Sequence, residues 1–316
     1  MTKPTLALFL TIVPLLAHAQ DQSDLAIAPE ASAGVIGSTL NPLQVALLHW
    51  YSANLTTRFT AGPGPYGVAF DGANIWVTLF NSDQVAKIRP SDGTVLGIFP
   101  VGTNPVGVAF DGAHIWVSNI NSHNVTKLLA STGAVLGTFS VGIEPVGLAF
   151  DGSSIWVTNN VSNNVMKLRV SDGHILGTFP VGLGAAAVAF DGTNIWVANN
   201  GSNSVTKLLA STGTVLGTFP VGTEPSGVVF DGANVWVANF GSNNVTKLRA
   251  SDGARLGAFP AGNGPNGIAF DGANIWVTDF NGAAVTKLLA STGAILGTFA
   301  VGPSPPTSPL MTVTSG

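Results

Sequence analysis

Hydrophobic and polar positions recur along the chain with a period of 40 residues. With no insertion or deletion, six full repeats occupy residues 61–100, 101–140, 141–180, 181–220, 221–260 and 261–300. Within the first repeat, short apolar runs occupy residues 66–70, 74–78, 84–88 and 94–99. Turn-forming combinations such as Asp-Gly and Ser-Asp-Gly separate these runs, which is typical of short β-strands. We therefore expect the same four strands in every repeat.

The second strand of each repeat carries large side chains on both of its faces. Side chains alternate along a strand, so Ile75 and Val77 point one way and Trp76 the other. A sheet with two apolar faces must be covered on both sides. Four-stranded sheets packed face to face around an axis meet this requirement, and a closed ring leaves no end sheet exposed. The pattern thus predicts an all-β fold, a β-propeller of four-stranded antiparallel blades.

One tryptophan recurs in the middle of the second strand of every repeat. The six residues are Trp76, Trp116, Trp156, Trp196, Trp236 and Trp276. A row of tryptophans could form a platform on which sugar rings stack. An unvarying row in mid-strand instead favours packing between neighbouring blades, because large aromatic side chains bury extensive apolar area.

The segments that flank the repeats bear on the number of blades. Residues 33–60 fit the same 40-residue grid, with Ile36 at the tryptophan position, and would supply three strands of another blade. After the last repeat, residues 309–313 fit the first strand. We predict a seven-bladed propeller over residues 33–313, its last blade closed by the N- and C-terminal strands. A six-bladed ring is the alternative. Residues 20–32 would form a linker and residues 314–316 a tail.

Residues 1–19 have the features of a secretory signal peptide. Lys3 precedes an apolar stretch over residues 6–17, and Ala17-His18-Ala19 fits the small-residue cleavage pattern. That stretch is too short to span a bilayer comfortably, and no later segment is apolar enough to do so. We expect a secreted or periplasmic monomer. The chain has no cysteine for disulfides, and its net charge of −4 provides no basic surface for nucleic acid.

Residues 155–182 resemble the YVTN-type propeller repeat. The shared marks are the WVTN core at 156–159, the following loop rich in Asn and Ser, Lys167 on the third strand, and a V-G-x-x-P-x-G link between blades, as at 141–147. The resemblance covers residues 33–313 and implies a propeller without an assigned activity. More distantly, the repeat is similar to streptogramin (virginiamycin B) lyases, which use a catalytic histidine, glutamates and magnesium. No histidine of this chain is accompanied by that motif, so the resemblance assigns no catalytic residue.

Acidic residues that differ between repeats gather at one end of the predicted propeller. We name this end the loop face: it comprises the loops between second and third strands, such as 80–83, and the loops that join successive repeats, such as 101–104. The four unshared acids of the propeller all fall in these loops: Asp83, Glu144, Glu224 and Asp279. No lysine or arginine accompanies them, so we expect negative potential that favours a cation or a basic partner. The alternative is solvated acids without a ligand.

One histidine, His123, also lies on the loop face, at the position that Asp83 occupies one repeat earlier. Asp83, His123 and Glu144 could converge on a divalent metal ion, since imidazole and carboxylate groups are common metal ligands. An ordinary surface histidine is the competing interpretation. Apart from such a cation, we expect no cofactor.

The residue near the start of the first strand also varies between repeats. It is Tyr66, Val106, Val146, Ala186, Ser226 or Asn266. First strands should line the central channel, so these residues could form a pocket of mixed polarity. Phe80, Phe240 and Phe280 could add an apolar rim. Sequence drift at a tolerant position is the alternative.

The sequence therefore favours a non-catalytic binding or scaffold protein that acts through its loop face. The ligand would be another protein or a small molecule. The candidate binding residues are Tyr66, Asp83, His123, Glu144, Glu224, Asn266 and Asp279. Two alternatives stay open: a metal-dependent enzyme similar to streptogramin lyase, and a structural cell-surface repeat protein.

Overall fold

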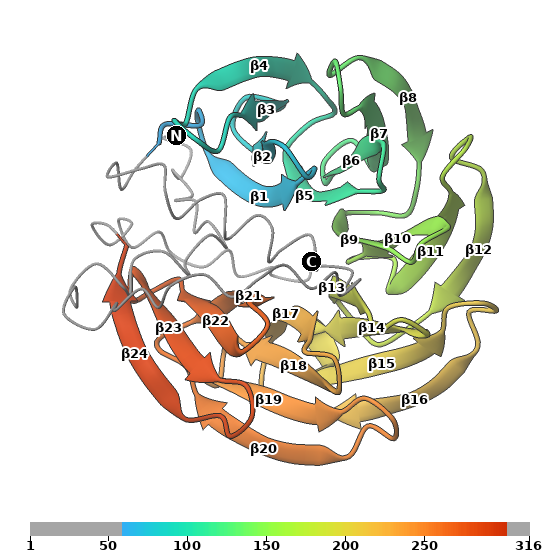
Figure 1. Cartoon of the computed structure of the whole chain (residues 1–316). Helices are drawn as coiled ribbons and strands as arrows, with labels where there is room; N and C mark the ends of the chain where they lie inside the picture. The colour runs from blue at the N-terminus through green and yellow to red at the C-terminus, as the bar shows by residue number, and fades with distance from the viewer. Residues whose placement is uncertain (1–58, 302–316) are drawn as a thin grey trace, which may run out of the picture.

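The computed structural model describes residues 59–301, which form six four-stranded antiparallel sheets arranged as blades around a central axis (Figure 1). Blades 1 to 3 contain the strands β1 Pro65–Phe70, β2 Ile75–Leu79, β3 Gln84–Ile88, β4 Val95–Pro100, β5 Pro105–Phe110, β6 His114–Asn119, β7 Asn124–Leu129, β8 Val135–Ser140, β9 Pro145–Phe150, β10 Ser154–Asn159, β11 Asn164–Arg169 and β12 Ile175–Pro180. Blades 4 to 6 contain β13 Ala185–Phe190, β14 Asn194–Asn199, β15 Ser204–Leu209, β16 Val215–Pro220, β17 Pro225–Phe230, β18 Asn234–Asn239, β19 Asn244–Arg249, β20 Arg255–Pro260, β21 Pro265–Phe270, β22 Asn274–Asp279, β23 Ala284–Leu289 and β24 Ile295–Ala300.

The predicted fold class is confirmed: the chain forms an all-β propeller of four-stranded antiparallel blades. The described residues make six blades, the number in the alternative prediction. Residues 33–58 and 309–313, assigned above to a seventh blade, lie outside the described residues, as do the predicted signal peptide, linker and tail. Within 59–301 a single short 3-10 helix, η1 Asn200–Ser202, interrupts the strands, and no helix is long and apolar enough to cross a bilayer.

The first strand of each blade lies innermost and the fourth lies at the circumference (Figure 1). Each innermost strand contacts the next, in the order β1, β5, β9, β13, β17 and β21. Blades 2 to 5 therefore each have a neighbouring blade on both faces, as the two-sided apolar pattern requires.

The tryptophans pack between blades rather than forming an exposed platform. Trp76 of blade 1 is fully buried and packs with Val85 against Ile115 and Leu128 of blade 2. The ring of Phe99 lies 5.6 Å from the Trp76 ring, a distance typical of favourable aromatic pairs. Trp116, Trp156, Trp196 and Trp236 pack against the next blade in the same way, which confirms the packing interpretation for these residues. Among the described residues, Trp276 packs only with Val285, Phe299 and Val301.

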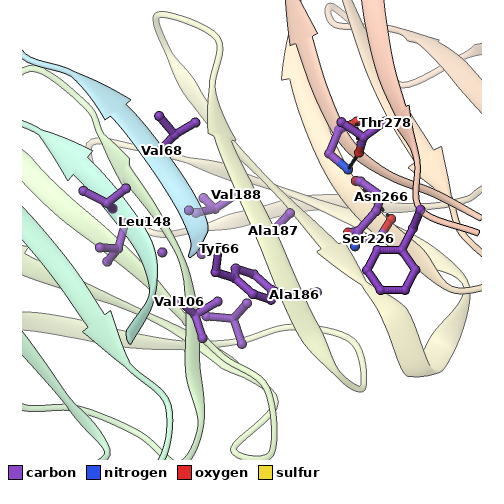
Figure 2. A pocket seen from close by; sticks show the side chains of 17 residues that line it. Tyr66, Val68, Val106, Leu148, Ala186, Ala187, Val188, Ser226, Asn266 and Thr278 are labelled. Carbon is purple, nitrogen blue, oxygen red and sulfur yellow. Dashed lines mark hydrogen bonds between the residues drawn. The ribbon is translucent and has the colours of Figure 1, made fainter. Parts of the chain in front are cut away.

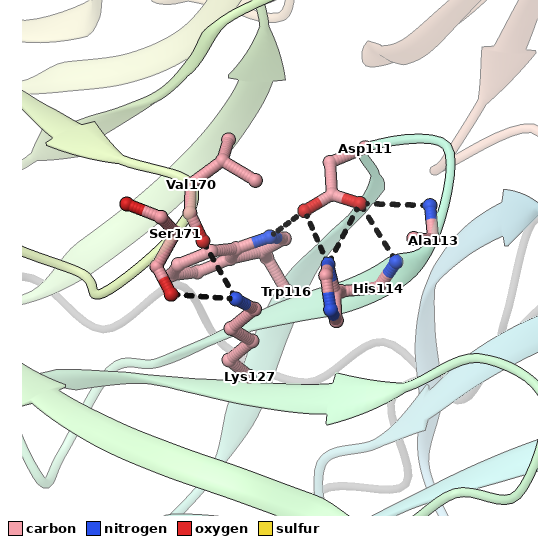
Figure 3. Close-up of polar contacts among 7 residues, drawn as sticks. All are labelled: Asp111, Ala113, His114, Trp116, Lys127, Val170 and Ser171. Carbon is pink, nitrogen blue, oxygen red and sulfur yellow. Dashed lines mark hydrogen bonds and ion pairs between the residues drawn. The ribbon is translucent and has the colours of Figure 1, made fainter.

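A buried polar cluster anchors each tryptophan, as Figure 3 shows for Trp116. The Trp116 indole N–H donates to Asp111 Oδ2 at 2.7 Å, and Asp111 Oδ1 accepts from the backbone N–H of His114 at 2.7 Å. Lys127 Nζ lies 5.3 Å from the Trp116 ring centroid and donates to the carbonyl oxygen of Val170, in the next blade, at 2.6 Å. The cluster therefore joins two blades through hydrogen bonds and a cation–π contact.

These contacts give the repeated aspartates a larger role than turn formation. Burial alone would raise the pKa of Asp111, but hydrogen bonds from the Trp116 indole and from the backbone of Ala113 and His114 outweigh it and lower that pKa. The carboxylate is thus held ionised beneath the tryptophan. The Arg–Asp pairs of alternate repeats, by contrast, are exposed local pairs, such as Arg89 and Asp92 at 2.9 Å.

Candidate functional site

The first strands surround a cavity of about 280 Å³ in the central channel. All six variable residues predicted to line this channel do so: Tyr66, Val106, Val146, Ala186, Ser226 and Asn266. Figure 2 shows the Tyr66 ring extending toward Ala186, with Ser226 and Asn266 on another side of the cavity. The prediction that these positions form a pocket of mixed polarity therefore agrees with the geometry.

Neighbouring first strands approach each other closely around this cavity. A Cβ atom on Gly67 would lie 2.2 Å from the carbonyl oxygen of Val106, so only glycine fits there. The hydroxyl of Thr78 accepts from the Gly67 N–H at 2.7 Å and donates to the same Val106 oxygen at 2.9 Å. These contacts fix the ring residues on rigid strands rather than on loops, which gives a precisely shaped site.

Two aromatic side chains, Tyr66 and Phe280, line the cavity. Phe280 lines it directly, and the ring of Phe240 lies 6.2 Å from that of Phe280. The ring centroid of Tyr66 lies 6.1 Å from that of Phe80. Blades 6 and 1 therefore supply aromatic rings to the lining, whereas blades 2 to 4 supply the aliphatic residues Val106, Val146 and Ala186.

Asp83 and His123 join loops on the loop face. Both have left-handed backbone conformations, with φ of 60° and 53°, which Asp, Asn and His adopt more readily than other non-glycine residues. Asp83 Oδ1 accepts from the backbone N–H of Asn104 at 2.9 Å, and His123 Nδ1 accepts from that of Glu144 at 3.2 Å. The same position in other blades holds Asn163, Asn203 and Asn243, which make the equivalent bond.

This shared bond was not predicted from the sequence, although the recurrence of Asp, His and Asn at one repeat position was a usable signal. It gives Asp83 and His123 a structural role that needs no ligand. His123 approaches Glu144 through the backbone of that residue, whereas Asp83 is hydrogen-bonded to Asn104 instead. Within residues 59–301, no three His, Asp or Glu side chains are close enough together to hold a metal ion.

Asp279 differs from the other loop-face acids because its side chain is buried, with 1% exposed. Thr286 donates to Asp279 Oδ2 at 2.8 Å, while Oδ1 has no hydrogen-bond partner among the described residues. Burial raises the pKa of Asp279 to about 6, against the opposing effect of the Thr286 bond. The other blades with a polar residue here have Asn119, Asn159, Asn199 and Asn239.

Of the seven candidate binding residues, Tyr66 and Asn266 line the cavity and the other five do not. Asp83, His123 and Glu224 are exposed and Glu144 is half-buried, all in the loops as predicted. The expectation that Asp279 adds to a surface patch of acids needs correction, because its position at the end of β22 turns the side chain into the blade. Three loop acids therefore face solvent to some degree.

Comparisons with known proteins support the fold. No known protein family matches the sequence, and no curated protein matches it. Among solved structures, hydrazine synthase of Kuenenia stuttgartiensis is similar with a TM-score of 0.69 and 19% identity, covering 79% of this chain and 91% of that chain. A streptogramin B lyase has a TM-score of 0.65 and 19% identity, covering 77% and 85%.

A functionally unknown protein from Desulfotomaculum acetoxidans is similar to the same degree, with a TM-score of 0.65 and 18% identity over 77% of this chain and 87% of that chain. At such low identity these likenesses establish a shared fold alone. Because hydrazine synthase and streptogramin B lyase differ in what they do, the fold leaves the function to be argued from the site.

Proposed function

We propose that this protein is a non-catalytic, extracytoplasmic binding protein that holds a small ligand in its central cavity, beside the loop face. One observation carries the proposal. In a chain whose blades are near copies, the residue near the start of the first strand varies between repeats, and all six residues at this position line one cavity. The N-terminal pattern of residues 1–19 is the basis for the proposed secreted or periplasmic location.

The contrast between repeated and varied positions supports binding rather than a purely structural role. Blade formation needs the same tryptophan, aspartate and lysine in each repeat, and these residues are constant. It does not need Tyr66 in one blade, Ala186 in another and Asn266 in a third. Different residues around a rigid ring create a lining without symmetry, which can hold a ligand in one orientation.

The chemistry of the lining favours binding over catalysis. Among the described residues that line the cavity, there is no Asp, Glu, His, Lys or Arg. General acid–base catalysis most often uses such a group, and the titratable side chain on the described lining is Tyr66, whose pKa is raised by burial. The similarity to streptogramin B lyase transfers no residue to this lining, so an enzymatic role lacks a named catalytic group.

The proposal is tested by filling the cavity. The protein is screened by thermal shift against a collection of small molecules, together with the variant Ala186→Trp. We expect compounds that raise the melting temperature of the wild type to lose this effect in Ala186→Trp. The matched control is Val161→Trp, which adds the same side chain at an exposed loop position outside the cavity.

A compound that stabilises the wild type and Ala186→Trp equally binds elsewhere. If all stabilising compounds behave in this way, or none stabilises the wild type, the proposed site is wrong. Circular dichroism and the melting curve of each variant without ligand show whether the fold is retained.

A further inference from the structure

The lining of the central cavity also specifies a class of ligand, provided that the proposed binding function is correct. We infer that the cavity takes a small uncharged molecule built of one planar ring with a hydrogen-bonding substituent. The inference rests on the charge of the lining, on the distribution of its apolar side chains, on its free polar groups and on its size.

The uncharged side chains of the described lining disfavour ionic ligands. None of the described side chains that line the cavity is charged, and the nearest acids in sequence, such as Glu144 and Glu224, are not part of the lining. Moving an ion from water into a site without a countercharge is costly. A neutral ligand avoids this cost.

The apolar part of the lining contains side chains that suit a flat ring. Val106, Val146 and Ala186 supply small aliphatic groups, and Tyr66 and Phe280 supply aromatic rings. Aromatic rings pack favourably against other rings in stacked or edge-to-face arrangements. A planar ligand can therefore lie against an aromatic side chain with its other face on the aliphatic residues.

Polar groups on the lining provide for one or two hydrogen bonds. Within the described residues, the Tyr66 hydroxyl and the Asn266 side-chain amide have no hydrogen-bond partner, so both can bind a ligand. The Ser226 hydroxyl donates to the carbonyl oxygen of Pro265 at 2.9 Å, and its oxygen can still accept a bond. A few such groups in an apolar pocket orient a ligand.

The size of the cavity limits the ligand to about one ring. Its volume of about 280 Å³ lies just below the range of roughly 300–1,000 Å³ that is common for sites of drug-sized ligands. A hydroxyl or carbonyl group on a single ring would reach Asn266 or Tyr66 without a larger space.

Four probes separate the features of this class. The first, p-cresol, is neutral, planar and polar; 4-methylbenzoate adds a charge, toluene removes the hydrogen bond, and 4-methylcyclohexanol removes planarity. Binding to the full chain is measured by ligand-detected NMR and calorimetry. We expect p-cresol to bind at least tenfold more tightly than 4-methylbenzoate and several-fold more tightly than the other two.

Variants link this preference to the cavity. Asn266→Leu should weaken p-cresol binding roughly three- to tenfold and leave toluene unchanged, as expected for the loss of one neutral hydrogen bond. Asn263→Leu, at an exposed loop position outside the lining, is the matched control and should change neither.

The outcomes distinguish the ligand class from the binding function. The inferred class is wrong if p-cresol does not bind or if 4-methylbenzoate binds more tightly than p-cresol. The proposed function still stands in that case, provided that other compounds bind the wild type and lose binding in Ala186→Trp. If no compound requires that cavity, both are wrong. Equal loss of p-cresol and toluene binding in Asn266→Leu would also overturn the inferred hydrogen bond.

Discussion

Replacing Asp279 by asparagine should stabilise the protein at neutral pH, with a gain that depends on pH. The Asp279 carboxyl is buried, and its Oδ1 has no partner among the described residues. In blade 5, Asn239 at the equivalent position donates to Thr246 at 2.9 Å and accepts from the Gly222 N–H at 3.1 Å. Asparagine at position 279 could make the matching bond to Thr286.

The magnitude follows from the pKa of Asp279. Its folded pKa of about 6 exceeds the ordinary value of 3.8. Each pKa unit corresponds to ~1.4 kcal/mol, so ionised Asp279 lowers the free energy of unfolding by at most about 3 kcal/mol. Because the folded state binds the proton more tightly, stability falls as pH rises from about 4 to 6 and stays lower above that range. For a chain of this size, about 3 kcal/mol corresponds to roughly 6 °C in melting temperature.

The assay is thermal and urea unfolding of the wild type and Asp279→Asn between pH 4 and 8. We expect the two proteins to differ least at pH 4, with the advantage of the variant growing to a plateau of up to about 6 °C above pH 6. Asp252→Asn is the control, because this exposed acid has a pKa lowered mainly by the Ala254 N–H. An advantage that does not change with pH, or lower stability of Asp279→Asn at pH 7.5, would refute the reasoning.

Four further predictions concern other parts of the chain. Lys207→Met should cost about 2–4 kcal/mol in urea unfolding, because the buried carbonyl oxygen of Ala250 and the partly buried one of Ser251 lose their donor. The exposed Arg249→Met is the control and should change little. If the loop face binds a divalent cation, calcium or magnesium should raise the melting temperature of the wild type but not of Asp83→Asn combined with Glu144→Gln; no effect on the wild type contradicts the site. Mass spectrometry of the exported protein should give a chain that begins at residue 20, and an intact N-terminus would contradict the signal peptide. Deletion of residues 20–58 should lower the melting temperature and increase binding of a hydrophobic dye if these residues complete the ring, whereas an unchanged melting temperature argues against a seventh blade.

The repeat pattern was sufficient to predict the blade and its strands. The alternation of Ile75, Trp76 and Val77 is a local property of an extended chain, and the turns between strands are set by adjacent residues. In the first repeat, β1 to β4 therefore begin and end within about one residue of the predicted runs. The repeat pattern also predicted that the varied positions, from Tyr66 to Asn266, meet around the axis, because equivalent residues of a ring lie at the same radius.

Other features depended on contacts between neighbouring blades, which the order of residues does not display. The sequence shows that Lys127 is repeated, but its bond to Val170 joins residues 43 positions apart. Likewise, Asp83 reads as a loop acid, and only the packing of one loop on the next shows that it binds Asn104.

Asp279 shows most clearly which features could not be predicted from the sequence. The sequence placed it at the end of a strand beside a loop, where a carboxylate is ordinarily solvated. Whether a side chain at such an end points to water or into the blade depends on the register of β22 with β21 and β23 and on the depth of the loops around it. The repeating unit, its strands and its ring of variable residues could thus be predicted from the order of residues alone. Which polar groups are buried could not, because burial depends on the neighbouring strands and blades that pack around each group.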